Sequence, residues 1–233
     1  MSDSQAEQEI KFFKKIFVVK GFLTKREIRN AEQLLEAGQW EKPASNDTQG
    51  NNDKFYWWMP LLSEYTNPIK GADFQILETI DAKIKNILNK DVIKLSTVNN
   101  EFYVKNCGIY SCNTVRPYYA DNSYPVDSDQ KPVVLGYPEV QGFDSITNLD
   151  KIKEWRIRDW GTELKYSCML FLSDETEGGN LVFPEHETEV TPERNKLVIF
   201  PSTPDYIHGE RPVVKGVKNC YCSWYASSNQ DLI

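Results

Sequence analysis

Histidine is scarce in this chain of 233 residues, which contains only His186 and His208. A cysteine nucleophile could therefore take its general base from no more than two positions. The five cysteines are odd in number and include no C-x-x-C pair. This pattern argues against a disulfide framework and favours reduced core cysteines in a cytoplasmic protein.

The chain also lacks a surplus of basic residues, because 27 lysines and arginines stand against 34 aspartates and glutamates, for a net charge of −7. A broad nucleic-acid surface needs clustered basic residues, so we expect no nucleic-acid partner. No apolar run reaches the roughly 18 residues of a membrane span, and the mean hydropathy is −0.55. The first residues, MSDSQAEQEIKFFKK, lack the apolar core of a secretory signal.

The motifs of several common enzyme classes are absent. The chain has no P-loop, no G-x-G-x-x-G and no G-x-S-x-G, which argues against the corresponding nucleotide-binding and hydrolase classes. Asp121, Asp127 and Asp129 are close in sequence, but they do not have the order of an EF-hand calcium loop.

What the sequence does contain is a C-terminal series of short apolar runs separated by glycine and proline. The runs are Cys168–Leu172, Leu181–Phe183, Lys196–Phe200, Pro212–Val214 and Lys218–Trp224. Runs this short, rich in Val, Ile, Phe and Tyr, predict strands of an antiparallel β fold. The length of the chain suits one domain over residues 1–233 with a full hydrophobic core.

The N-terminal part, residues 15–95, reads as support for that β core. A short strand is expected at Ile16–Val19, and Thr24 and Glu27 have the spacing of a capping box at the start of a helix that runs to about Ala37. A second helix is predicted from Asp73 to about Leu88 by apolar residues at helical spacing. Further strands are expected at Val92–Thr97 and Glu101–Tyr110.

Two stretches have compositions that suit a binding site. Residues 117–160 read as irregular and are rich in Tyr, Asp and Trp, so we expect residues 122–160 to form a lid-like insertion over a polar pocket. The aromatic run Phe55–Met59 is interpreted either as cover over the sheet or as the wall of a substrate groove.

Several motifs in the chain resemble those of the iron(II)- and 2-oxoglutarate-dependent dioxygenases, and most closely the prolyl 4-hydroxylase branch. They are IFVVKGFLTKREI near the N-terminus, GG-x-x-x-FP at Gly178–Pro184, V-x-P at Val190–Pro192, FP at Phe200–Pro201, and H-x-x-x-PV-x-x-G-x-K from His208 to Lys218. The resemblance covers roughly residues 15–225. It implies a mainly β, α+β fold in which a double-stranded β-helix (a cupin-like jelly roll) over residues 100–226 is backed by N-terminal helices.

The resemblance also assigns roles to single residues. It makes His208 the distal iron ligand and pairs Lys218 with the far carboxylate of 2-oxoglutarate. Ser167, Tyr110 and Trp224 would line the same cofactor pocket, and no catalytic residue is expected beyond the metal ligands. The implied cofactors are Fe(II) and 2-oxoglutarate, with ascorbate in a supporting role. A triad of two histidines and one carboxylate leaves open iron positions for an oxo-acid and for O2, and a lysine gives a compact charge for a carboxylate.

The first half of that triad departs from the family pattern, which requires H-x-D after Y-x-x-G. Counting from Tyr110, Asp121 falls on the carboxylate position, Tyr119 falls on the histidine, and Asn113 replaces the glycine. Three interpretations of Tyr119 stay open: it binds iron as a phenolate, which we favour; it stands off and leaves a two-ligand Asp121/His208 centre; or the register slips and another group fills the site. His186 lies in the loop after FP, where the family places a turn away from the metal.

The sequence thus leads to two hypotheses from different classes. In the first, the chain is a dioxygenase that hydroxylates a C–H bond of a substrate, with a peptidyl proline ahead of free amino acids and other small molecules. In the second, it is a non-catalytic or repurposed β-helix protein that binds a metal, an oxo-acid or a peptide partner. Asp121, His208 and Lys218 all stand at the expected offsets, which favours the first.

Overall fold

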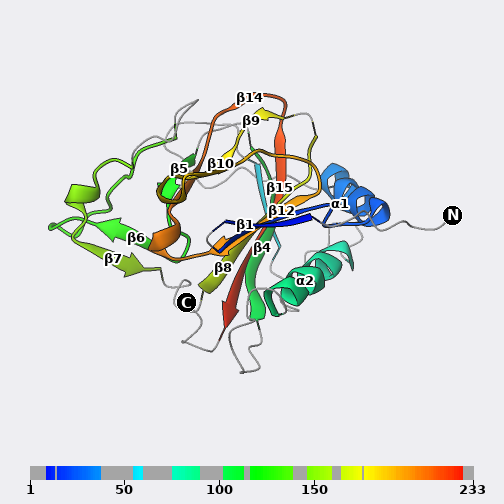
Figure 1. Ribbon diagram of the computed structural model, residues 1–233, viewed down its shortest axis with the longest axis horizontal. Helices are drawn as coiled ribbons and strands as arrows, with labels where there is room; N and C mark the ends of the chain where they lie inside the picture. Colours follow the sequence, from blue (N-terminus) through cyan, green and yellow to red (C-terminus); the bar gives the residue numbers. More distant parts are fainter. Residues whose placement is uncertain are drawn as a thin grey trace.

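The computed structural model describes residues 9–13, 15–37, 55–59, 75–89, 102–112, 116–138, 146–158, 164–174 and 176–227. The predicted strand at Val92–Thr97 lies outside these residues. Within them the chain is mainly antiparallel β structure with two helices on one side (Figure 1), as predicted. No helix in this part of the chain is long and apolar enough to cross a membrane.

A seven-stranded antiparallel sheet is the largest element of the fold. Its strands, in spatial order, are β1 (Glu9–Phe13), β2 (Ile16–Lys20), β12 (Lys196–Pro201), β8 (Leu164–Phe171), β15 (Lys218–Ser227), β4 (Phe102–Cys112) and β3 (Phe55–Met59). The aromatic run Phe55–Met59 therefore forms an edge strand of this sheet, paired with β4.

A second, four-stranded antiparallel sheet faces the first. Its order is β11 (Thr188–Val190), β10 (Leu181–Phe183), β13 (His208–Glu210) and β5 (Arg116–Tyr119). Two small sheets complete the β structure and join β14 (Val213–Lys215) to β9 (Glu177–Gly178), and β6 (Ser123–Val126) to β7 (Glu154–Ile157). In the described part of the chain, single 3-10 turns lie between strands at η2 (Leu149–Lys151), η3 (Pro184–His186) and η4 (Pro204–Tyr206).

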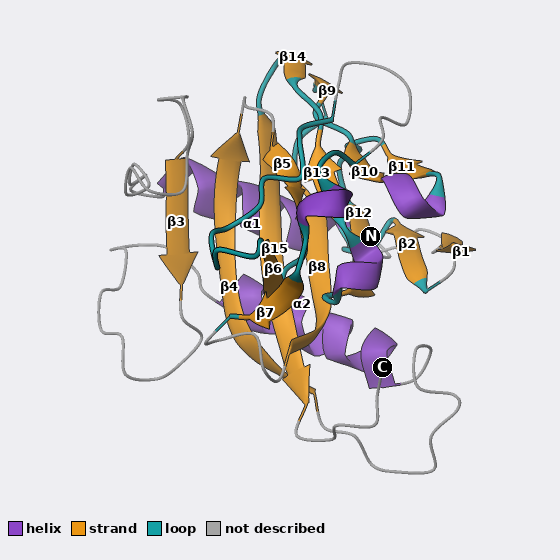
Figure 2. Cartoon of the chain, turned by 90° about the vertical axis from the view of Figure 1, so that its left-hand side faces the viewer, coloured by secondary structure: helices purple, strands orange, loops and turns teal. Residues whose placement is uncertain are grey.

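Both helices, α1 (Lys25–Ala37) and α2 (Gln75–Ile87), pack on the face of the large sheet that points away from the small one (Figures 1 and 2). Alternation along β8 explains the two faces, because successive side chains of a strand point to opposite sides. Tyr166, Cys168 and Leu170 join the helices in one buried cluster. Met169 and Phe171 point the other way, into a second cluster between the two sheets.

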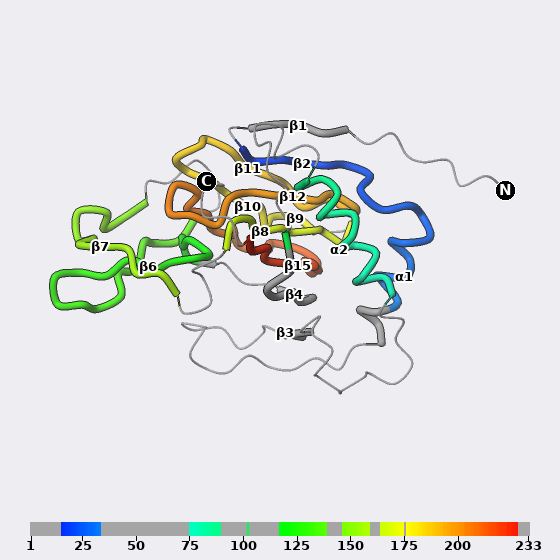
Figure 3. Tube along the Cα trace, turned by 90° about the horizontal axis from the view of Figure 1, so that it is seen from below, coloured from blue at the N-terminus to red at the C-terminus, as the bar shows by residue number. Residues whose placement is uncertain are grey.

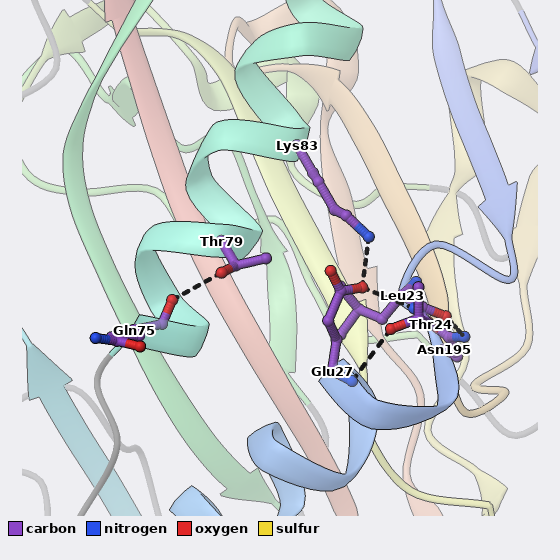
Figure 4. Close-up of polar contacts among 7 residues, drawn as sticks. All are labelled: Leu23, Thr24, Glu27, Gln75, Thr79, Lys83 and Asn195. Carbon is purple, nitrogen blue, oxygen red and sulfur yellow. Dashed lines mark hydrogen bonds and ion pairs between the residues drawn. The ribbon is translucent and has the colours of Figure 1, made fainter. Parts of the chain in front are cut away.

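A network of local hydrogen bonds fixes the start of α1 against the sheet and against α2 (Figure 4). The amide of Glu27 donates to Thr24 Oγ1 at 3.3 Å and the amide of Thr24 donates to Glu27 Oε2 at 2.7 Å, which confirms the capping box. Lys83 of α2 donates to the same Glu27 carboxylate. The side chain of Asn195 makes two hydrogen bonds to Leu23. Its Oδ1 accepts from the Leu23 amide at 2.6 Å, and its Nδ2 donates to the Leu23 carbonyl oxygen at 2.7 Å.

The stretch between residues 117 and 160 contains more regular structure than its sequence suggests. β6 and β7 pair as an antiparallel ladder, with Pro125 opposite Trp155, and they project at the end of the molecule away from the helices (Figure 3). A third buried cluster lies beneath this region and includes Tyr118, Leu135 and Ile207. The expectation of an irregular segment is therefore wrong for these two strands. Their sequences did not indicate strands because β6 contains a proline and its partner β7 is distant in sequence.

Candidate active site

Strands β5 and β13 bring three of the predicted site residues together. Tyr119 and His208 are directly paired in the ladder between these strands, so their side chains share a face. Their ring centroids are 4.4 Å apart and the ring planes are tilted by 56°. Asp121 lies two residues after Tyr119 in the chain, and its Oδ2 lies 3.6 Å from His208 Nε2.

A backbone hydrogen bond sets the orientation of the His208 ring. Nδ1 lies 3.0 Å from the carbonyl oxygen of Tyr206, the residue that ends the η4 turn. A carbonyl can only accept, so Nδ1 carries the proton, and Nε2 is the atom that faces Asp121. This is the arrangement that metal-bound histidines adopt, because the hydrogen bond at one nitrogen leaves the lone pair of the other for the ion.

The surroundings of this pair are apolar and exclude water. His208 is 1% exposed and Asp121 is 5% exposed. The rings of Phe200 and Phe183 lie 4.6 and 5.6 Å from the His208 ring, measured between centroids. A buried carboxylate is costly unless it is paired with a positive charge, so the environment of Asp121 favours a cation held between it and Nε2.

Among the residues that the structure describes, no further histidine or carboxylate joins Asp121 and His208. In the part of the chain that the structure describes, no three or more His, Cys, Asp or Glu side chains are grouped so that they could hold a metal ion. Tyr119 is the residue whose ring adjoins His208 on the neighbouring strand, and its phenol is a hard oxygen donor. The structure thus places the ring of Tyr119 beside that of His208.

The second histidine is bound to the turn that precedes His208. His186 lies in η3, its Nε2 is 2.7 Å from the carbonyl oxygen of Asp205, and its ring stacks on Tyr206 at 4.4 Å and 21°. His186 and His208 therefore make hydrogen bonds to successive carbonyls of the η4 turn. This geometry agrees with the expectation that His186 lies in a turn after the FP motif, and it shows His186 supporting the turn that orients His208.

Lys218, the residue that the resemblance pairs with an oxo-acid, is completely buried and already holds a carboxylate. Its Nζ forms an ion pair with Glu210, and both side chains are 0% exposed. Nζ also donates to the carbonyl oxygen of Gly179 at 3.0 Å. Glu210 was not predicted from the sequence. The available signal was its position two residues after His208, because alternate residues of a strand share a face.

The Gly178-Gly179 pair lets the chain pass closely over Lys218. Both glycines have positive φ, +79° and +69°, where other residues are strained. A Cβ at Gly178 would lie 2.4 Å from the carbonyl oxygen of Pro212, and one at Gly179 would lie 3.2 Å from Lys218 Cδ. This turn, at the start of the GG-x-x-x-FP motif, therefore packs closely against the lysine.

The remaining predicted cofactor residues, Ser167, Trp224 and Tyr110, lie in β8, β15 and β4. Lys218 begins β15, and β8 and β4 pair with it on either side. Ser167 is opposite Trp224 in the β8–β15 ladder, and its Oγ is 2.8 Å from Oγ of Ser202 in a buried hydrogen bond. Trp224 packs against the cluster between the sheets. Tyr110 pairs through its backbone with Cys220, while its side chain, like all of Asn113, lies outside the described part of the chain.

Comparison with known proteins gives a family match for about a third of the chain, in its C-terminal part. Residues 145–226, which include His208, Glu210 and Lys218, match a family model. That model describes the 2OG-Fe(II) oxygenase superfamily. A search of curated proteins finds no match to the sequence.

Solved structures of similar fold include several oxygenases. The viral collagen prolyl hydroxylase of Paramecium bursaria Chlorella virus-1, solved with 2-oxoglutarate, is 15% identical with a TM-score of 0.54 over 91% of this chain and 96% of that one. A prolyl hydroxylase of Trichoplax adhaerens, in complex with a fragment of the hypoxia-inducible factor, is 13% identical with a TM-score of 0.54 over 93% and 88%. HygX of Streptomyces hygroscopicus, with nickel and 2-oxoglutarate, is 12% identical with a TM-score of 0.54 over 93% and 84%. At such identities the likeness establishes the fold, and the prediction of a cupin-like jelly roll backed by N-terminal helices is confirmed.

Proposed function

We propose that this chain is an iron(II)- and 2-oxoglutarate-dependent oxygenase with an atypical metal site formed by Tyr119, Asp121 and His208. The observation that carries the proposal is the placement of His208 Nε2 3.6 Å from Asp121 Oδ2, with Nδ1 held by a backbone carbonyl. The match of residues 145–226 to the 2OG-Fe(II) oxygenase model supports the same assignment.

The donor set fits iron. One imidazole nitrogen and one carboxylate oxygen, both buried, are two of the three ligands in the facial triad of non-haem iron oxygenases. Tyr119 would supply the third donor as a phenolate, which requires its phenol to lose a proton on coordination. Phenolate favours iron(III) over iron(II), so this ligand would slow the oxygen chemistry relative to a centre with two histidines.

The pocket also fits the far carboxylate of 2-oxoglutarate in its chemistry, because Lys218 already binds the carboxylate of Glu210. Bound iron and 2-oxoglutarate together supply the oxidising power, which is the chemistry of the cofactors. The protein holds the metal through Asp121 and His208, excludes water with Phe183 and Phe200, and provides the cation that a dicarboxylate requires.

A peptidyl proline is the substrate that we favour. The support is the similarity of the fold to prolyl hydroxylases, one of which was solved with a peptide fragment. Strand β6 begins two residues after Asp121 and pairs with β7, and the buried cluster of Tyr118, Leu135, Ile146 and Ile207 lies beneath this region. This segment is positioned to form one wall of a peptide site, in the role expected of the lid-like insertion. Free amino acids are the second class of substrate.

The test is conversion of 2-oxoglutarate to succinate by the iron-loaded protein with a panel of proline-containing peptides. We expect Asp121→Asn, which keeps the shape and removes the charge, to abolish turnover. Tyr119→His restores the nitrogen ligand of the family pattern, and we expect it to raise turnover. Equal turnover by the wild-type protein and Asp121→Asn would overturn the proposal.

Two observations favour a second candidate, a repurposed protein that binds a metal or a carboxylate without oxygenase activity. Tyr119 stands where the family has histidine. Glu210 forms an ion pair with Lys218, the lysine that the resemblance assigns to the co-substrate. Metal binding by the wild-type protein, without turnover of any peptide in the panel, would support this candidate.

A further inference from the structure

The Glu210–Lys218 ion pair is the feature of the site that the proposed function does not explain. Both side chains are completely buried, and Glu210 lies on β13 while Lys218 begins β15. A buried pair of this kind offers little net stability over apolar residues of the same size. Glu210 lies two residues after His208 and pairs with the lysine that the resemblance assigns to 2-oxoglutarate. This position indicates a role in the site.

We propose that the carboxylate of Glu210 is an internal competitor that keeps 2-oxoglutarate out of its site. The proposal rests on the proposed function and concerns the regulation of the same pocket. In the structure, Glu210 takes the place at Lys218 that the far carboxylate of 2-oxoglutarate would take. The co-substrate binds tightly only when Glu210 leaves Lys218.

Charge and space both support this competition. The Glu210–Lys218 pair is neutral, so an incoming dicarboxylate meets no net positive charge, and it meets a like charge if Glu210 stays in place. Lys218 also donates to the Gly179 carbonyl, and the glycine turn lies against its methylene chain. The lysine is therefore fixed between Gly179 and Glu210, and of these two partners only the Glu210 side chain can move away without moving the backbone.

Release of Glu210 is also linked to the metal through the backbone. Glu210 and His208 are alternate residues of the three-residue strand β13, which pairs with β5 on one side and β10 on the other. The ladder shows a register shift between His208 and Glu210. Because both residues belong to one short strand, the Glu210–Lys218 ion pair also helps to hold the strand segment that carries His208.

The experiment compares 2-oxoglutarate affinity, measured by anaerobic calorimetry on iron(II)-loaded protein, in the wild type and Glu210→Gln. We expect Glu210→Gln to bind 2-oxoglutarate about 10- to 100-fold more tightly, which is the worth of one charge-assisted hydrogen bond. Glu189→Gln is the matched control, because Glu189 is an ion-paired carboxylate of the same four-stranded sheet that binds Arg211 instead of Lys218. Equal affinities in the wild type and Glu210→Gln would overturn the proposal.

A metal-free readout separates this inference from the proposed function. Glu210→Ala removes the whole carboxylate and leaves Lys218 buried, so we expect added glutarate to raise its melting temperature, or to be needed for its refolding, and to have little effect on the wild type. The double variant Glu210→Ala/Lys218→Met should show no response to glutarate. A response of the single variant without any iron binding would sustain the carboxylate competition and refute the oxygenase. An equal response of single and double variants, or no response of either, would refute the competition.

Discussion

Removal of the charge on Lys218 is expected to destabilise the protein far more than removal of a surface charge. Lys218→Met keeps the length of the side chain and leaves the Glu210 carboxylate buried without its partner, while the Gly179 carbonyl loses a donor at 3.0 Å. Breaking a buried ion pair by removing one partner costs about 3–5 kcal/mol of unfolding free energy. Single domains have a total of about 5–15 kcal/mol, so the loss should be visible directly.

Urea unfolding of the metal-free protein, followed by tryptophan fluorescence, measures this loss. Lys20→Met is a suitable control, because Lys20 pairs with Glu193 at 3.3 Å on the surface, with side chains 42% and 48% exposed, and such pairs are worth about 0–1 kcal/mol. The double variant Lys218→Met/Glu210→Leu should recover most of the stability, since it removes both charges. A loss below about 1 kcal/mol for Lys218→Met, a magnitude typical of surface pairs, would refute the reasoning, as would additive losses in the double variant.

Three further predictions concern the frame around the site. Thr24→Ala removes the acceptor for the Glu27 amide and should cost about 0.5–2 kcal/mol of unfolding free energy, measured by urea unfolding. Thr24→Ser is the control variant that keeps the hydroxyl. An unchanged unfolding midpoint for Thr24→Ala would contradict the capping role. Gly178→Ala should cost more than about 1–2 kcal/mol, because the residue has a positive φ and its Cβ would lie 2.4 Å from the Pro212 carbonyl oxygen; a melting temperature equal to that of the wild type would show that the turn relaxes easily. Burial, helped by the charge of Tyr206, raises the pKa of Tyr166 to about 12, so its contribution to stability is complete below the unfolded pKa of about 10 and is lost as the pH rises toward 12; circular dichroism melts that are flat between pH 9 and 12 would contradict this.

Local patterns in the sequence were enough to predict the frame of the molecule. The C-terminal strands alternate with glycine and proline turns, and the capping box at Thr24 depends on residues three positions apart. These features are fixed by interactions near in sequence, which single-sequence reasoning captures. The same reasoning missed strands β6 and β7, because their pairing joins residues about thirty positions apart and one of them contains Pro125.

Part of the candidate site was predictable, because the sequence resembles motifs with fixed offsets between their site residues. The offsets from Tyr110 placed Asp121 and Tyr119 near His208, and the structure brings these three side chains together. The partner of Lys218 was not foreseen, because it depends on how two strands, β13 and β15, are packed across the space between the sheets. The sequence signal for this partner is a glutamate two residues after a candidate metal ligand, because alternate residues of a strand share a face.

The central claim is that Asp121 and His208 hold a metal ion, and anaerobic titration of the purified protein with iron(II) tests it most directly. Binding is followed by calorimetry and by the visible absorption that appears on adding 2-oxoglutarate or on oxidation to iron(III). We expect saturable binding by the wild-type protein, a marked loss of affinity in Asp121→Asn, and a strong tyrosinate absorption with iron(III) that disappears in Tyr119→Phe. Failure of the wild-type protein to bind iron, or equal affinity in Asp121→Asn, would contradict it.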